Sequence, residues 1–73
     1  MTWNIRIAEL EGDIDPVYGF REVYYNEKGE PYCYGNVTLE GDAKEELESI
    51  IEKLQDAIKK PLFKPKDFGL CDL

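Results

Sequence analysis

The sequence predicts a small α+β domain, a three-stranded antiparallel sheet followed by one amphipathic helix on one face. Three observations predict it: alternating apolar and polar residues near the N-terminus, aromatic-rich segments separated by glycine and proline turns, and a later segment with apolar residues at spacings of three and four. A chain of 73 residues has room for one domain only. We expect residues 1–60 to form the strand–strand–strand–helix domain and residues 61–73 an extended, partly docked and mildly basic tail.

The first two strands follow from local patterns. Residues 3–9 alternate in polarity, which is typical of a strand with one face in water. Turn-forming residues at 12–16 end this strand, and the aromatic and β-branched segment 17–25 predicts the second. The apolar side chains of the first strand are expected to point inward: Trp3, Ile5 and Ile7.

A short hairpin is expected to join the second and third strands. Residues 26–29 form a turn signal, in which Gly29 can adopt the left-handed backbone conformation that closes a tight loop. The third strand is expected at about residues 31–39. The pairing of these two strands is the local contact that the sequence predicts most directly.

The helix is expected to start at Gly41-Asp42, with the Asp42 side chain accepting a bond from the Glu45 amide while Glu45 reaches back. Pro61 should end it after about nineteen residues. Acids in the first turns and lysines in the last match the helix dipole. One apolar stripe is expected to pack on the first strand, and its members are Leu47, Ile50, Ile51, Leu54 and Ile58.

The sheet carries more aromatic surface than one helix can cover. Neighbours such as Tyr24 and Tyr25 point to opposite faces of a strand, so both faces bear aromatic side chains. Either the tail folds over the second face through Phe63, Phe68 and Leu70, or another molecule docks there. We expect the partner-binding residues to be Tyr18, Phe20, Tyr24, Tyr32 and Tyr34.

Charge is distributed unevenly along the chain, whose net charge is -7. Residues 1–58 carry fourteen acids and five bases, whereas residues 59–73 carry four lysines and two acids. An acidic body repels phosphate groups, so we expect no direct binding to nucleic acid or to an anionic membrane. The N-terminal residues do not resemble a secretory signal, and no apolar run approaches the roughly 20 residues needed to span a bilayer. We therefore expect a cytoplasmic protein whose partner is another protein or a second copy of itself.

Residue chemistry gives no support for an enzyme, a metal site or a cofactor site. Histidine is absent, which removes the commonest general base and metal ligand. The acids at 11–15 begin like a calcium loop, but the later ligands of such a loop are missing. Cys33 and Cys71 lack metal or redox spacing, and we expect neither a disulfide nor a reactive thiol. Glu22, in an apolar strand, is expected to pair with Arg6 or Arg21.

Short motifs give the chain a likeness to a known group. These are Met1-Thr2-Trp3-Asn4, Tyr18-Gly19 with Glu22-Val23-Tyr24-Tyr25, Gly29 with Pro31, Glu45-Glu46-Leu47 and Lys60-Pro61. In this order they resemble a group of short, uncharacterised bacterial proteins that open MTWNYRV and carry a YGxxEVYY strand. The order of elements is also weakly similar to HicB-type antitoxins, whose strand–strand–strand–helix unit binds a small basic toxin. The resemblance implies no catalytic residues.

Two functions of different kind fit these observations. The first is a non-catalytic protein-binding module that acts through the tyrosine-rich sheet face and the acidic surface. The alternative is an acidic mimic of nucleic acid that inhibits a DNA- or RNA-binding protein. The mimic requires carboxylates in rows at phosphate-like spacing, whereas lysines interrupt the acids of the expected helix.

Overall fold

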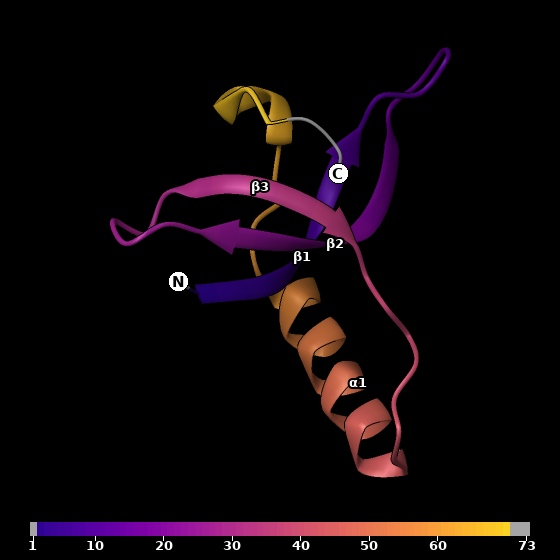
Figure 1. The fold of residues 1–73 in the computed structure, drawn as a ribbon. Helices are drawn as coiled ribbons and strands as arrows, with labels where there is room; N and C mark the ends of the chain where they lie inside the picture. Colours follow the sequence, from indigo (N-terminus) through magenta and orange to yellow (C-terminus); the bar gives the residue numbers. More distant parts are fainter. Residues whose placement is uncertain (1, 71–73) are drawn as a thin grey trace.

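The computed structural model describes residues 2–70, which form a three-stranded antiparallel sheet, one α-helix and a short 3-10 helix (Figure 1). Their bounds are β1 (Thr2–Leu10), β2 (Val17–Tyr25), β3 (Pro31–Asn36), α1 (Lys44–Lys59) and η1 (Pro65–Phe68). The strands lie in the order β1-β2-β3. The predicted class, an α+β domain with an antiparallel sheet followed by one helix, is confirmed.

The turn between β2 and β3 forms as the sequence predicts. Gly29 has a φ of 78°, in the left-handed region that glycine adopts without steric cost. The Asn26 side chain also fixes the turn, because its Oδ1 accepts bonds from the amides of Lys28 and Glu30 at 2.9 and 3.0 Å. β3 ends at Asn36, three residues before the predicted end at Leu39.

Register decides which side chains share a face. Trp3 pairs with Tyr24, Ile5 with Glu22 and Ile7 with Phe20, and directly opposed residues of antiparallel strands point to the same side. The other face carries the remaining half of each strand, including Ala8, Val23, Tyr25 and Tyr34. A β-bulge shifts the register between Tyr24 and Tyr25, where they meet β3.

Helix α1 starts differently from the prediction. Ala43 is the N-cap residue and makes no side-chain capping bond, so the expected reciprocal pair of Asp42 and Glu45 is wrong. Instead, the Asp42 amide donates to the Glu46 carboxylate at 2.8 Å. This bond satisfies a backbone donor ahead of the first turn. The C-terminal end agrees with the prediction, because the helix stops at Lys59, just before Pro61.

Helix α1 is anchored to β1 by its C-terminal half, while its N-terminal half projects away from the sheet (Figure 1). Ala57 is the buried residue of the helix, and Ile5 is buried on β1. The prediction that the whole stripe packs on β1 is wrong: Leu47, Ile51 and Ile58 are exposed, as is Trp3. The apolar stripe is rotated away from the sheet, so only its edge is covered.

The C-terminal segment covers the face opposite the helix. Phe63 pairs with the edge of β1, where its amide donates to the Ile7 carbonyl and the Glu9 amide donates to the Phe63 carbonyl, both at 2.9 Å. Its ring is 5% exposed and belongs to one core cluster with Ala8, Val23 and Tyr34. The segment therefore supplies the aromatic side chain that closes this face.

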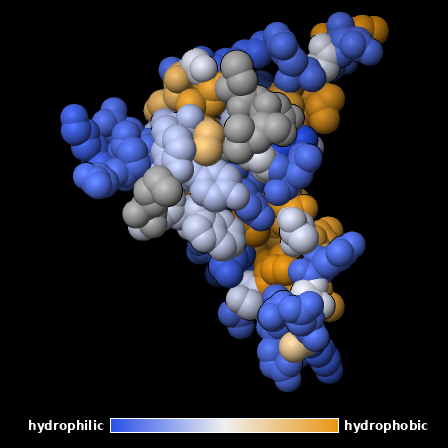
Figure 2. All heavy atoms as spheres, viewed as in Figure 1, coloured by the Kyte–Doolittle hydropathy of each residue, from blue (hydrophilic) through white to orange (hydrophobic). Residues whose placement is uncertain are grey.

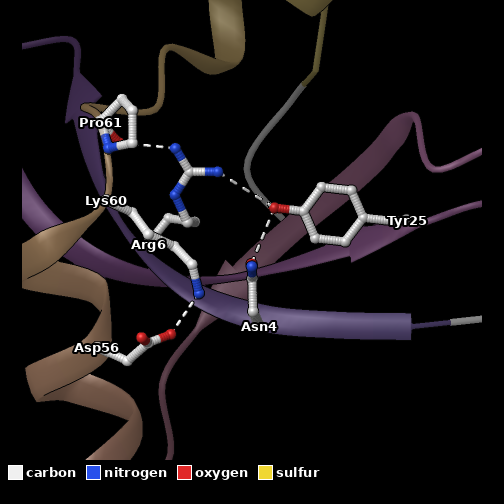
Figure 3. A network of polar contacts seen from close by, with 6 residues as sticks. All are labelled: Asn4, Arg6, Tyr25, Asp56, Lys60 and Pro61. Carbon is white, nitrogen blue, oxygen red and sulfur yellow. Dashed lines mark hydrogen bonds and ion pairs between the residues drawn. The ribbon is translucent and has the colours of Figure 1, made fainter.

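Polar contacts hold the start of this segment in place (Figure 3). Arg6 donates to the Pro61 carbonyl at 2.6 Å and to the Tyr25 hydroxyl at 3.4 Å. The Tyr25 hydroxyl in turn donates to the Asn4 side chain at 2.8 Å. These bonds join β1, β2 and the residues that follow α1, and Arg6 also lies over the Phe63 ring at 5.7 Å.

Ion pairs connect the rest of the C-terminal segment to the end of β1 and the loop that follows it. Lys66 pairs with Glu11 at 2.6 Å, and Lys64 lies 3.8 Å from Glu9. Hydrogen bonding to Lys66 lowers the pKa of Glu11. The mildly basic tail thus docks on the acidic end of β1, although exposed pairs of this kind contribute little to stability.

Candidate interaction surface

Three of the predicted partner-binding residues lie on one face of β2. Tyr18, Phe20 and Tyr24 alternate along the strand, and the register places them on the side that carries Ile5 and Ile7. This is the helix side of the sheet, but α1 lies along β1. The aromatic side chains of β2 are therefore beside the helix. We call Tyr18, Phe20, Glu22 and Tyr24, with Tyr32 at the adjoining bulge, the aromatic face.

Exposure separates the five predicted residues into two groups. Tyr18 and Tyr32 are 58% and 43% exposed, while Phe20 and Tyr24 are half-buried. Tyr34 is 7% exposed and lies on the other side of the sheet, in the cluster with Phe63. The structure thus brings four of the five to the aromatic face or its edge and places Tyr34 in the core.

Glu22 makes the central polar contact of the aromatic face. Its carboxylate accepts a hydrogen bond of 2.5 Å from the Tyr24 hydroxyl. The expected pairing with Arg6 or Arg21 is wrong, because those two arginines oppose each other on the other face. The Tyr24 hydroxyl is thereby held against the strand, with its ring beside Cys33 of β3.

This hydrogen bond to Glu22 raises the pKa of Tyr24 from 10.0 to about 12, with smaller contributions from desolvation and from Cys33 and Tyr32. The neutral phenol is the form that the folded protein favours. The stabilisation from this bond is therefore complete below pH 10 and is lost as the pH rises toward 12.

We predict that Glu22→Gln moves the Tyr24 titration back toward its ordinary pKa of 10.0, because the amide removes the negative charge that opposes ionisation. Phenolate absorbance followed against pH measures this, and Tyr24→Phe, subtracted from each curve, isolates the one hydroxyl. Glu27→Gln, an exposed acid in the hairpin turn, is the matched control and should leave the curve unchanged. Identical curves for Glu22→Gln and the unaltered protein would contradict the assignment.

A shallow groove of about 230 Å³ separates the helix from the start of β1. Lys53 lies over the Trp3 ring at 5.0 Å, a cation–π contact. Sequence reasoning expected Trp3 to point into the core, whereas it is 46% exposed beside this lysine. Two features of the sequence could have indicated this contact: Trp3 stands near the end of a strand, and Lys53 stands at the edge of the apolar stripe.

Larger grooves lie on the opposite side of the sheet, along the C-terminal segment. One of about 560 Å³ is lined by Arg21, Tyr34, Pro65 and Lys66 among others. Arg21 donates to the Phe20 carbonyl at 2.8 Å. This groove is separate from the aromatic face.

Metal ligands, cysteines and membrane-spanning helices were considered for the described residues, 2–70. In this part of the chain, no cluster of three or more cysteine or acidic side chains is arranged to hold a metal ion. Cys33 is half-buried and free, and Cys71 lies outside the described residues. The helices of residues 2–70 include none with the length and apolarity needed to cross a membrane.

Comparisons with protein-family models, with curated proteins and with solved structures found no match.

Proposed function

We propose that this chain is a non-catalytic protein-binding module that contacts another protein through its aromatic face. The main support for the proposal is that the two faces of the sheet are covered to different extents. One face is closed by Phe63 and the C-terminal segment, whereas the aromatic side chains of β2 lie beside the helix. Aromatic side chains combine large apolar area with few rotatable bonds, which favours them at interfaces.

Tyrosine is well suited to a surface that is exposed to water in the free protein and covered by a partner in the complex. Its ring supplies apolar area, and its hydroxyl keeps a hydrogen bond in either state. Tyr24 is already oriented by Glu22, so little side-chain entropy is lost when it is covered. Tyr18 and Tyr32 extend the same surface toward both ends.

Charge defines the kind of partner. The chain carries a net charge of -7, and Glu22 places a carboxylate within the aromatic face. A partner with a basic rim around an apolar centre is complementary to this surface, and its association should weaken as salt screens the charges.

The experiment compares the intact chain with Tyr24→Ser and Phe68→Ala as immobilised baits in extract of the native cell. Phe68 is 54% exposed and lies within the C-terminal segment, away from the aromatic face, so its variant is the matched control. A basic protein should bind the intact chain and Phe68→Ala. Tyr24→Ser should bind it roughly tenfold less tightly or worse when the purified pair is titrated, as expected for an interface anchor.

Equal binding of the partner to Tyr24→Ser, or no partner at all, would contradict the proposal. A captured nucleic-acid-binding protein that is released by DNA or RNA, and that tolerates Tyr24→Ser, would establish the acidic mimic instead.

A further inference from the structure

The apolar side chains along one side of α1 form a regular pattern, and all of them except the half-buried Leu54 are exposed. Leu47, Ile51, Leu54 and Ile58 follow one another at intervals of four, three and four residues, with isoleucine and leucine alternating. This is the spacing of a two-helix seam. We call these four residues the helix seam. Ile51 and Ile58 are 53% and 63% exposed, and Leu47 is also exposed.

The seam is distinct from the part of the helix that contacts the sheet. Ala57 is buried at that contact, and Ile51 lies roughly 120° around the helix axis from it. The anchored side and the seam are therefore adjacent, and they meet at the half-buried Leu54. Figure 2 shows apolar atoms reaching the surface where the helix leaves the sheet.

Helices of this length seldom persist without an apolar partner. The 16 residues of α1 are close to the length at which isolated helices are marginal in water, and packing of one face normally stabilises them. The N-terminal half of α1 projects beyond its own sheet (Figure 1). The sheet therefore leaves most of the seam uncovered, and a second molecule can cover it.

The molecule exposes the amount of surface that a dimer contact would remove. Its accessible surface is 5469 Å², whereas a compact monomer of 8.5 kDa exposes about 4,700 Å². The excess of roughly 800 Å², to which the projecting hairpin loops contribute as well as α1 (Figure 1), is comparable with what each partner contributes to an interface of standard size. The radius of gyration, 12.8 Å, likewise exceeds the value of about 11 Å for a compact domain of this length.

Charge along the helix identifies the partner and its direction. Residues 40–48, at and before the start of α1, carry five acids and one lysine, whereas residues 49–60 carry two acids and three lysines. A second copy in antiparallel orientation brings the acidic N-terminal end of each helix against the weakly basic C-terminal end of the other, and it also opposes the helix dipoles favourably. A parallel copy would place acid against acid.

We propose that the helix seam is the contact between two copies of this chain, paired antiparallel through α1. Leu47 packs against Ile58 of the second copy, and Ile51 packs against Leu54 of the second copy. On the outer edge of the seam, Glu48 of one copy lies near Lys59 of the other, and both side chains are exposed. The aromatic faces take no part and remain available to the partner.

Sedimentation of the full chain over a range of concentrations tests the dimer. Ile51→Lys should raise its dissociation constant roughly tenfold or more, because it places a charge in the seam. Glu52→Lys alters the next residue, outside the seam, and should leave a dimer. A monomer at every concentration, or an Ile51→Lys variant that still dimerises, overturns the proposal.

Charge exchange gives a second test that leaves every apolar residue in place. Lys59→Glu should weaken the dimer several-fold, and Glu48→Lys combined with Lys59→Glu should restore it. Failure of the double variant to restore the dimer overturns the antiparallel arrangement. Tyr24→Ser separates this proposal from the proposed function: loss of the dimer in that variant would assign self-association to the aromatic face and refute the helix seam.

Discussion

Phe63→Ala is expected to remove most of the stability of the protein. The Phe63 ring is 5% exposed, fills the space above Ala8, Val23 and Tyr34, and contacts Arg6. Removing a buried phenylalanine ring costs roughly 3 to 5 kcal/mol. A small domain has about 5 kcal/mol of stability in total, so the variant should keep about 2 kcal/mol or less and should unfold at a much lower urea concentration.

Phe68→Ala is the matched control for this prediction. Phe68 stacks on Phe63 with ring centroids 5.6 Å apart but is itself 54% exposed. Its loss should cost about 1 kcal/mol, the value of an aromatic pair. Urea unfolding followed by circular dichroism measures both variants. A Phe63→Ala midpoint equal to that of Phe68→Ala would show that the C-terminal segment does not complete the core.

Local patterns predicted the strands and the hairpin well. The second strand was expected at residues 17–25, where β2 lies, because alternation and turn residues act over a few neighbours. Gly29 adopts the left-handed conformation for the same local reason. The end of the helix before Pro61 also depends on a local effect, the loss of a backbone donor.

Predictions that depended on long-range contacts were less successful. The apolar stripe of the helix shows which side is apolar but not what covers it, and the sheet covers only the side with Ala57. Assigning Tyr34 to a face required the register of β3, which the bulge beside Tyr24 shifts. The alternatives left open for the second face depended on whether Phe63 could reach it, and the edge of β1 decides that through backbone hydrogen bonds.

The environment of Glu22 could have been predicted more closely from the sequence. Adjacent residues of a strand point to opposite faces, so Arg21 could not be its neighbour, whereas Tyr24 two positions on could. The structure shows that hydrogen bond. Strand periodicity alone would therefore have identified Tyr24 as a neighbour of Glu22.

The central claim is that the two faces of the sheet differ, one closed by the C-terminal segment and the other presenting its aromatic side chains. Tyr24 and Tyr25 are adjacent and test this directly. Tyr25 packs against the core cluster and donates to Asn4 at 2.8 Å, whereas the Tyr24 hydroxyl donates to Glu22 of its own strand.

The decisive measurement is the urea unfolding of Tyr24→Ser and Tyr25→Ser side by side, in dilute protein. Tyr25→Ser should lose roughly 2 to 4 kcal/mol of unfolding free energy, because it removes a ring from the core and leaves its polar neighbours unpaired. Tyr24→Ser should lose about 1 kcal/mol, because its half-buried ring lies outside the core cluster and its hydroxyl bonds only within its own strand. Equal and large losses in the two variants would show that both faces are closed, and the aromatic face would then have no free surface to offer a partner.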